Sequence, residues 1–355
     1  MKRKILIIGS SIDVPGGIST VIKNQLESDC SGYSFTHIAT YKEGTGGQKI
    51  IFFIRALINI AMFVVRKRPE IIHIHVSERG SFWRKMCIIC ILKPYNGKLV
   101  LHHHGAEFIS FYEALNPAAK GLVKWVLETV DVNIVLGNSI RRIMMQKISH
   151  KAVYKVIYNA VKSPVKNKYE VSGKGILFMS CFEKRKGIQD LTAVIRDLNP
   201  CLEKNILFYL CGEGRELEDT VTFIKKCGLE ERVVFTGWIN AKEKSEIFPK
   251  IALHILPSYN EGLPMSVLET MAYGIPNIAS STGAVSETIT DGVNGWLFKA
   301  GDTGQLKDLI LRGMAEEKLR REISIKAYET IKGRFTLERQ MGKLKRCYDL
   351  LLKVV

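Results

Sequence analysis

The 355-residue chain lacks several features that would place it in a class directly. It contains no Asp-x-Asp sequence, no internal repeat of fixed period and no low-complexity tract. Its eight cysteines follow no regular spacing, which argues against a disulfide framework and favours free thiols in a reducing cytoplasm. The first apolar run, Ile5 to Gly9, is too short for a secretory signal and is expected to be a strand.

A long uninterrupted apolar run is also missing. The longest, Ile50 to Val65, has 16 residues and contains Arg55 and Asn59. As a helix it would extend about 24 Å, less than the ~30 Å hydrocarbon core of a bilayer. A basic cluster follows at residues 66–68. We therefore expect no membrane span, but either a buried helix of a layered domain or a helix with one face in the headgroup region.

Acidic residues are scarce in the first half of the chain. Residues 1–170 hold 25 Lys and Arg against 11 Asp and Glu, whereas residues 171–355 hold 27 against 24, so most of the net charge of +17 lies in the first half. Anionic lipid, nucleic acid and a phosphorylated substrate would each suit such a surface. Nucleic acid is disfavoured as a partner, because the basic residues are not interleaved with aromatic ones and no nucleic-acid-binding module is recognisable.

Short apolar runs rich in β-formers alternate with helical patterns from end to end. The expected strands fall at residues 4–9, 70–76, 98–104, 132–137, 175–180, 206–212, 232–237, 252–258, 275–280 and 295–298. Strands this apolar are covered on both faces, and their alternation with helices indicates parallel sheets built from βαβ units. The sequence therefore predicts an α/β protein with two Rossmann-like, doubly wound parallel-sheet domains.

The domain boundary is expected where Pro, Gly, Ser and Lys concentrate, at residues 162–175. This predicts an N-terminal domain over residues 1–165 and a C-terminal domain over 166–335. An amphipathic helix over about 336–355 is expected to pack back on the first domain. In doubly wound sheets the ligand lies beyond the C-terminal ends of the strands, so two such domains would form a site in a cleft between them.

The stretch Glu261 to Glu269, EGLPMSVLE, places two carboxylates around the start of a helix. Glu261 follows a strand, Pro264 suits the first helical turn, and Gly274 ends the helix. Unpaired backbone N–H groups beside Leu263 would form an anion site at the helix N-terminus. The spacing suits a nucleotide sugar, with one carboxylate on hexose hydroxyls, the other on the ribose hydroxyls and the diphosphate between them.

These residues resemble the E-x7-E motif of the retaining GT-B glycosyltransferases of family 4, the group 1 glycosyl transferases. Further similarity lies in VPGGIST at 14–20, EKRKGI at 183–188, CGEGRE at 211–216, VVFTGWI at 233–239 and DGVNGWLF at 291–298. The resemblance covers about 300 residues of the chain. It implies a GT-B fold with two domains facing across a cleft, donor binding mainly in the C-terminal domain, acceptor binding in the N-terminal domain, and retention of configuration.

The resemblance also implies residue roles. Lys186 would contact the departing phosphates and His104 would hydrogen-bond the transferred hexose, so the expected catalytic residues are Glu261, His104 and Lys186. Glu107 is a candidate for the acceptor side, as is His75, for which a core histidine is an equal alternative. The expected donor-binding residues are Gly16, Gly17, Lys186, Gly212, Gly214, Glu261, Gly262, Leu263, Pro264 and Glu269.

Two further features of the sequence bear on this assignment. The family usually has Arg where this chain has Cys181, and a thiol cannot bind a diphosphate as a guanidinium does. Stabilisation of the leaving group must then come from Lys186, from Lys184 or Arg185, or from a weaker interaction. His102, His103 and His104 are adjacent, but alternation along a strand turns His103 to the opposite face from the other two. We therefore expect no metal site there.

The predicted function is metal-independent transfer of a hexose or N-acetylhexosamine from a nucleotide-diphosphate sugar, of uridine rather than guanosine, to a lipid-linked or saccharide acceptor. The absent Asp-x-Asp fits this, since metal-dependent single-domain enzymes carry that motif. The pathway would be cell-surface polysaccharide or glycolipid synthesis, in the cytoplasm at the inner face of an anionic membrane. The alternatives are a nucleotide-sugar-binding regulator without catalysis and a nucleotide-sugar epimerase. A dinucleotide oxidoreductase is disfavoured because GEGREL at 212–217 lacks the third glycine.

Overall fold

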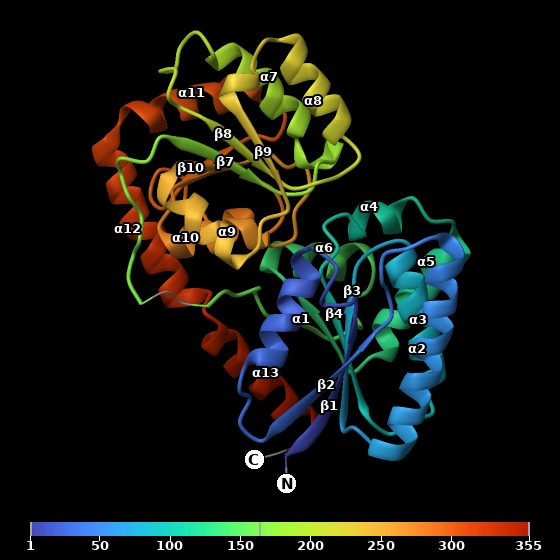
Figure 1. The fold of residues 1–355 in the computed structure, drawn as a ribbon. Coiled ribbons are helices and arrows are strands. Elements are labelled where there is room, and N and C mark those ends of the chain that lie inside the picture. Colours follow the sequence, from blue (N-terminus) through green and yellow to red (C-terminus); the bar gives the residue numbers. More distant parts are fainter. Residues whose placement is uncertain (1, 163–164, 354–355) are drawn as a thin grey trace. The chain divides into compact units, whose positions relative to one another are not determined.

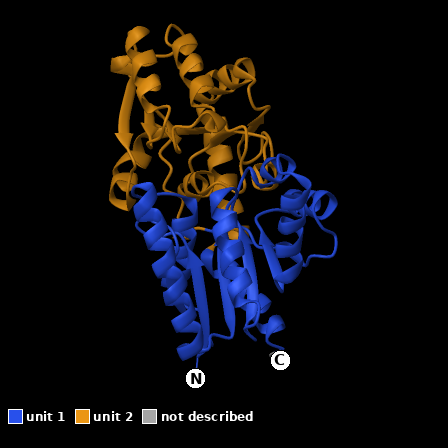
Figure 2. Ribbon diagram, turned by 90° about the vertical axis from the view of Figure 1, so that its right-hand side faces the viewer, with its two compact units in different colours: residues 1–160, 337–355 blue, residues 161–336 orange. Residues whose placement is uncertain are grey.

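The computed structural model describes residues 2–162 and 165–353, and the chain divides into two compact units. Unit 1 comprises Met1–Ala160 and Leu337–Val355, and unit 2 comprises Val161–Thr336 (Figure 2). The division therefore falls five residues before the expected boundary at 165. Ser163 and Pro164, in the expected linker, lie outside the described residues.

Unit 1 contains one sheet of parallel strands in the order β2-β1-β3-β4-β5-β6 (Figure 1). The strands are β1 (Arg3–Gly9), β2 (Tyr33–Ala39), β3 (Ile71–Val76), β4 (Lys98–His103), β5 (Val132–Val135) and β6 (Tyr154–Val156). The helices are α1 (Gly17–Glu27), α2 (Gly46–Lys67), α3 (Gly80–Leu92), α4 (Phe108–Glu113), α5 (Pro117–Thr129), α6 (Asn138–Lys147) and α13 (Leu337–Leu351).

Helices cover both faces of this sheet because its strands are apolar on both sides. Leu6 and Ile8 of β1 belong to one core cluster, with residues of α2, α3, α5 and α6. Ile5 and Ile7 belong to another, with residues of α1 and α13. The period-2 alternation of β1 thus divides its side chains between two helical layers.

Unit 2 contains a second parallel sheet, in the order β12-β11-β10-β7-β8-β9. The strands are β7 (Gly175–Met179), β8 (Phe208–Cys211), β9 (Val233–Gly237), β10 (Ile251–Leu256), β11 (Asn277–Ser280) and β12 (Trp296–Phe298). The helices are α7 (Ile188–Leu198), α8 (Leu217–Lys226), α9 (Ala241–Ile247), α10 (Met265–Tyr273), α11 (Thr303–Ala315) and α12 (Glu317–Arg334). Four short 3₁₀ helices are described as well: η1 (Lys184–Lys186), η2 (Glu230–Arg232), η3 (Phe248–Lys250) and η4 (Val285–Glu287).

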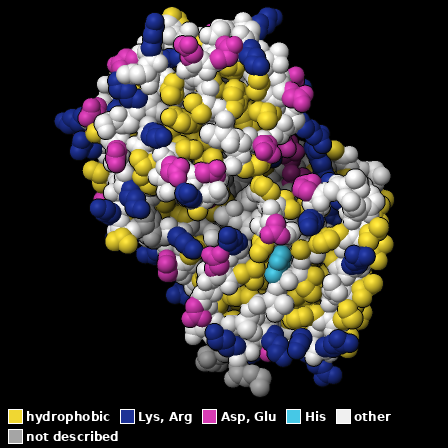
Figure 3. All heavy atoms as spheres, in the orientation of Figure 1, with side chains coloured by type: hydrophobic (Ala, Val, Ile, Leu, Met, Phe, Trp, Pro, Cys, Tyr) yellow, Lys and Arg dark blue, Asp and Glu magenta, His cyan; other side chains and the backbone are white. Residues whose placement is uncertain are grey.

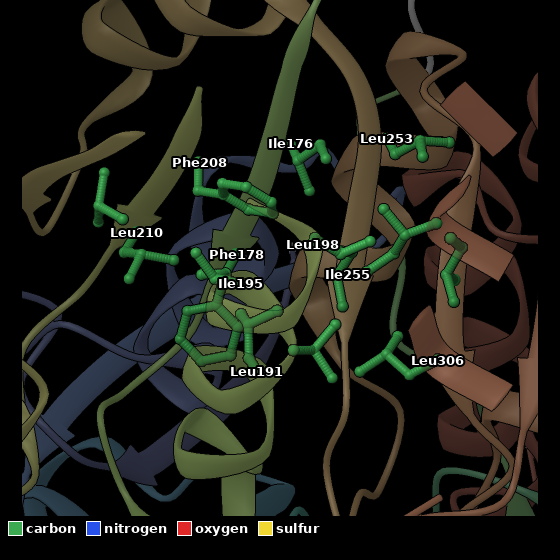
Figure 4. Packing of buried hydrophobic residues seen from close by; sticks show 14 of the residues in the cluster. Ile176, Phe178, Leu191, Ile195, Leu198, Phe208, Leu210, Leu253, Ile255 and Leu306 are labelled. Atoms are coloured by element: carbon green, nitrogen blue, oxygen red, sulfur yellow. The ribbon is translucent and has the colours of Figure 1, made fainter. Parts of the chain in front are cut away.

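The larger core of unit 2 lies between its sheet and α7, α8, α11 and α12. Ile176 and Phe178 of β7 meet Leu191 and Ile195 of α7 there, and Leu306 of α11 closes the cluster (Figure 4). A smaller cluster on the other face contains Leu177 and Met179 of β7 with Phe248 and Ile275. Both units therefore have the predicted doubly wound architecture.

The fold differs from the expectation at the sheet edges. Each of the ten expected strands is present, and the structure adds β2 and β6, which form the two edges of the first sheet. Much of β2 and all of β6 are only partly buried. Their sequences, YSFTHIA and YKV, have fewer apolar residues than a strand covered on both faces, so the apolar pattern did not reveal them.

The sequence left open whether the apolar run at residues 50–65 forms a buried helix or a helix with one face at a membrane surface. In the structure this helix, α2, is not buried. It extends from Gly46 to Lys67, 22 residues or about 33 Å, so the expected length of about 24 Å was wrong. By length and composition alone it is the one helix among the described residues that is able to cross a membrane. Its buried residues are Ala56, Ile60 and Val64. The eight cysteines are all free, as their irregular spacing predicts.

Candidate active site

The strand order of unit 2 reverses between β7 and β10, which are hydrogen-bonded neighbours. From β7 the chain continues outward through β8 and β9, and from β10 through β11 and β12. In doubly wound sheets the crevice beyond the strand ends at such a reversal is the usual ligand site. Lys186 follows β7 and Glu261 follows β10, so both predicted residues stand at this point.

Lys186 and Glu261 form a buried ion pair. Lys186 Nζ donates to Glu261 Oε1 at 2.6 Å, and the residues are 9% and 7% exposed, respectively. A buried charge is costly unless it has a partner, and here each side chain supplies the other's countercharge. The pair holds an ammonium group and a carboxylate at fixed positions, next to the residues that precede α10.

The start of α10 is close to the predicted geometry. The helix begins at Met265 with Pro264 immediately before it, and it ends at Tyr273 with Gly274 in the left-handed conformation at φ 94°. Gly262, Leu263 and Pro264 are buried in the loop between β10 and α10. This loop is held to the next one, because the N–H of Ala284 donates to the carbonyl of Gly262 at 2.8 Å.

Glu269 lies on α10, but its partner was missed by sequence reasoning. Lys244 Nζ of α9 donates to Glu269 Oε2 at 2.5 Å, and the two side chains are 27% and 20% exposed. Lys244 lies in a charged stretch, AKEKSEI, which reads as a solvated helix. Each carboxylate of the motif is thus held by one lysine from a different element.

The predicted donor-binding glycines of unit 2 have a packing role in the structure. A Cβ on Gly212 would lie 2.0 Å from the carbonyl oxygen of Ser180, and one on Gly214 would lie 2.3 Å from that of Phe182. Gly283, which sequence reasoning did not single out, would place a Cβ 1.8 Å from the carbonyl oxygen of Glu261. Gly212 and Gly214 therefore let two chain segments approach, and their contact with a donor remains a prediction.

Arg185 lies beside the position where the family usually has arginine. Its Nη2 is 3.7 Å from Cys181 Sγ, and its Nε donates to Glu183 Oε2 at 2.7 Å. Burial raises the pKa of the Cys181 thiol, which therefore stays protonated and uncharged. Lys184, by contrast, is exposed. Lys186, Lys184 and Arg185 were the candidates to replace the missing arginine charge. Of these, Arg185 is the one with a side-chain contact to Cys181 among the described residues.

In unit 1 the strand order reverses between β1 and β3. Gly16 and Gly17 follow β1 at this reversal, where Gly16 precedes α1 with φ 142° and no side-chain cap. Glu107 precedes α4, and its Oε2 accepts from Arg79 Nη2 at 3.2 Å. Gly16, Gly17, His104 and Glu107 thus lie beyond strand ends, as the sequence indicates, whereas His75 lies within β3, so its expected place after the strand was wrong.

Four histidines, on β3, on β4 and directly after β4, lie on one side of the sheet. His75 is level with His102 in the register, and the rings of His73, His75, His102 and His104 are within stacking or tilted contact. His103 points elsewhere and pairs with Asn133 Oδ1 at 3.1 Å, as the predicted alternation requires. His73 also belongs to the cluster, but it lies on β3, whereas the three consecutive histidines 102–104 lie on and after β4.

A hydrogen-bonded chain leads through this cluster to His104. Gln25 Oε1 lies 3.1 Å from His75 Nε2, and His75 Nδ1 lies 2.8 Å from His104 Nε2. With the Gln25 oxygen accepting from His75, the His75 Nδ1 accepts from the Nε2–H of His104. His104 then presents Nδ1 as an acceptor, which suits a hexose hydroxyl. His75 is 2% exposed, so it supports His104 rather than meeting an acceptor directly.

His73, His75 and His102 have potential ligand atoms within 4.8 Å of one another. Their ring hydrogen bonds reach Tyr348, Gln25 and other histidines, but no carboxylate among the described residues. Burial lowers the pKa of His75 well below its usual value, and neighbouring groups, Lys85 among them, lower it further. A divalent ion would bring charge into a buried region without a compensating carboxylate, although neutral imidazoles are themselves metal ligands. The absence of a metal site remains a prediction.

The histidine cluster should make unit 1 sensitive to acid. Burial lowers the pKa of His73 and His104 to about 3 and of His103 to about 4. Because the unfolded histidines titrate near pH ~6.5, their stabilising effect is complete above that pH and is lost as the pH falls toward 3–4, by up to ~1.4 kcal/mol per pH unit for each ring. Thermal unfolding between pH 8 and 5, with hydrogen exchange to separate the units, should show unit 1 losing stability first.

Unit 2 is the internal control for this prediction, because it contains a single histidine, His254. Parallel loss of protection in both units on acidification would show that the buried imidazoles do not govern the effect.

A shallow hollow of about 530 Å³ lies beside the ends of β11 and β12, lined by Thr282, Phe298, Lys299 and neighbouring residues. None of the predicted donor-binding residues lines it. We therefore base the candidate site on the strand reversal and the ion pairs.

Comparison with known proteins agrees with this fold. Residues 162–330 match the family model described as "Glycosyl transferases group 1". The N-acetyl-alpha-D-glucosaminyl L-malate synthase of Bacillus anthracis is 24% identical over 81% of this chain and 76% of its own length. The lipopolysaccharide 1,6-galactosyltransferase of Escherichia coli K12 is 24% identical over 88% of this chain and 90% of its own length.

Among solved structures, Anabaena HepE in complex with UDP is similar, with a TM-score of 0.77 and 16% identity over 98% of this chain and all of that one. At this identity the likeness concerns the fold. The matched residues, 162–330, cover nearly all of unit 2, including Lys186, Glu261 and Glu269. The chain therefore has the fold of the GT-B glycosyltransferases, and the sequence of its C-terminal unit is similar to the group 1 glycosyl transferases.

Proposed function

We propose that this chain is a retaining, family 4 glycosyltransferase that moves a hexose or N-acetylhexosamine from a UDP-sugar to a lipid-linked or saccharide acceptor. The observation that carries the proposal is the buried Lys186–Glu261 pair, 2.6 Å long, at the strand reversal of unit 2. Relatives named for lipopolysaccharide and O-antigen synthesis support an acceptor in cell-surface polysaccharide or glycolipid. The UDP bound to HepE supports the donor class.

In the proposed reaction the bond between the sugar C1 and the diphosphate oxygen breaks, and a bond from C1 to the acceptor oxygen forms on the same face. The acceptor proton goes to an oxygen of the departing diphosphate. The sugar carbon becomes cation-like while negative charge grows on the diphosphate. Lys186, the N-terminus of α10 and the turn at Gly16 and Gly17 would stabilise that charge without a metal.

The remaining predicted residues bind and orient the substrates. Glu261 would accept hydrogen bonds from hexose hydroxyls, and Glu269, held by Lys244, would accept from the ribose hydroxyls. His104 would accept a hydrogen bond from the hexose through Nδ1, and Glu107 would meet the acceptor. The enzyme would work at the inner face of a membrane, which suits unit 1, where 27 Lys and Arg stand against 12 Asp and Glu.

Donor binding provides the first test. The protein would be heated with UDP-glucose, UDP-galactose, UDP-N-acetylglucosamine and the corresponding guanosine nucleotide sugars. A donor at ~100 times its Kd stabilises the folded state by ~2.7 kcal/mol, which raises Tm by roughly 5–10 °C for a domain of this size. The correct uridine donor should give this shift, and Glu269→Ala should abolish most of it.

A radiolabelled form of that donor then separates the possible activities. Transfer of label to an added lipid-linked or oligosaccharide acceptor supports the proposal. Isomerised nucleotide sugar formed without an acceptor would identify an epimerase instead. Donor binding with neither donor hydrolysis nor transfer, across a panel of acceptors, would identify a non-catalytic regulator.

A further inference from the structure

The side of α2 that faces away from the sheet carries a continuous apolar surface, which we call the α2 stripe. It consists of large side chains that are 42–74% exposed, Ile50, Ile51, Ile54, Ile58, Met62 and Val65. At ~100° per residue these six positions fall within an arc of about 120°. Figure 3 shows hydrophobic side chains along the edge of unit 1 over α2. A patch of this size on a folded unit marks an interaction surface.

The opposite side of α2 fixes the helix to unit 1. Ile60 and Val64 belong to the core cluster under the sheet, and Ala56 is 4% exposed. These buried residues lie roughly 140° around the helix from the centre of the α2 stripe. Crossing a bilayer would require the helix to leave this core. A helix that stays attached is able to present its stripe to a membrane surface only by lying flat on it.

Charges border the stripe on one side and at its end. Arg55 and Arg66 follow its edge in the helical projection, and Lys67 and Arg68 come at the C-terminus of α2. All four side chains are exposed. In contrast, the nearest acidic residues in sequence are Glu43 and Glu70, which lie outside the helix. An apolar stripe with basic residues along one side and at its end is complementary to acyl chains beneath anionic headgroups.

We propose that the α2 stripe is the surface by which this protein binds an anionic lipid bilayer. The six side chains enter the boundary between headgroups and acyl chains, while Arg55 and Arg66 remain at the level of the phosphates. A second copy of the chain, the other conceivable occupant, would bring the same basic residues together across a symmetric contact, which disfavours it. The inference deepens the proposed function, because it names the surface that would bring the enzyme to a lipid-linked acceptor.

Vesicle co-sedimentation tests the inference without donor or acceptor, so a failed activity assay does not affect its outcome. The full chain would be mixed with vesicles of phosphatidylglycerol and phosphatidylethanolamine, and with vesicles of phosphatidylcholine alone. The triple variant Ile51→Gln, Ile54→Gln, Ile58→Gln should bind the anionic vesicles about 100-fold more weakly than the parent. The double variant Arg55→Gln, Arg66→Gln should lose about 10- to 30-fold on anionic vesicles and nothing on phosphatidylcholine.

A matched control replaces three exposed apolar side chains of similar size that lie outside α2. Leu122, Ile325 and Leu350 are also exposed and lie on α5, α12 and α13. Their combined replacement by glutamine should leave vesicle binding unchanged. Melting temperatures close to that of the parent would show that each variant folds. Should a variant not fold, the single change Ile54→Trp replaces it, with a blue-shifted tryptophan emission expected on vesicles.

Four results would overturn the inference. One is a triple variant that sediments like the parent, and another is a control variant that loses as much binding. The third is an Ile54→Trp emission that stays unshifted when vesicles are added. The fourth is a parent protein that runs as a dimer and is dissociated by the triple change, with no vesicle binding by either protein, which would assign the stripe to a second copy of the chain.

Discussion

Replacing Lys186 by methionine is expected to lower kcat for sugar transfer by about 100- to 1,000-fold, the usual cost of removing one fixed charge donor from a leaving group. Lys186 Nζ is buried and 2.6 Å from Glu261, so its charge acts where water screens little. Transfer of label from the donor, measured at saturating donor and acceptor, gives kcat directly. Lys184→Met, two residues away and exposed, is the matched control.

The same change should also reduce stability, and the two effects are separable. Methionine at 186 leaves Glu261 buried without its partner, which costs about 3–5 kcal/mol in comparable pairs. The double variant Lys186→Met, Glu261→Gln removes both charges and should recover most of the lost Tm. It should not recover kcat, because neither new side chain carries a charge. A folded Lys186→Met protein with parental kcat would exclude Lys186 from the chemistry.

The sequence predicts the core of the fold because its strands are buried on both faces. β3 is IIHIHV and β10 is IALHIL, and every residue of both strands is buried. Such runs differ clearly from helical patterns in length and composition. The edge strands β2 and β6 lack this signal because each is paired on one side only, and their exposed residues are more polar.

The exposure of α2 was not predictable from its composition. Ile54 and Ile60 are both isoleucines within one apolar run, yet Ile54 is 50% exposed and Ile60 is 1% exposed. A buried helix and a helix at a membrane surface share the same residues, and they differ in what covers the second face. Packing of α2 against the sheet was needed to assign each side chain to a face.

Site residues that belong to one continuous segment were predictable from the sequence, but contacts between residues from different segments were not. Glu261 and Glu269 stand out because a loop, Pro264 and a helix follow in order. Their lysines come from other segments, 75 and 25 residues away, and no local pattern pairs them. The same limit applies to His104, whose partner His75 lies on the neighbouring strand and becomes visible only through the register of β3 and β4.

Replacing Arg185 is the second change for which we expect a large loss of activity. The Arg185 side chain contacts Cys181, the position at which the family usually has arginine. Its guanidinium lies 3.7 Å from Cys181 Sγ and is oriented by Glu183. If the proposed diphosphate site includes this guanidinium, Arg185→Ala removes a second fixed charge from it and is expected to lower kcat about 100-fold. Arg185→Lys should recover little, because an ammonium group cannot form the two parallel hydrogen bonds that a guanidinium makes to phosphate.

A double variant that carries arginine at position 181 instead of 185 tests whether the two positions serve the same site. In the double variant Cys181→Arg, Arg185→Ala, the guanidinium starts from position 181 instead of 185, and kcat should rise at least about 10-fold above that of Arg185→Ala alone. Cys181→Ala is the control for loss of the thiol and should behave like the parent, because the protonated thiol carries no charge. If Arg185→Ala keeps parental kcat while Lys186→Met loses it, the diphosphate is stabilised through Lys186 and the helix N-terminus alone. If the double variant instead stays as slow as Arg185→Ala, position 181 does not face the diphosphate in this chain.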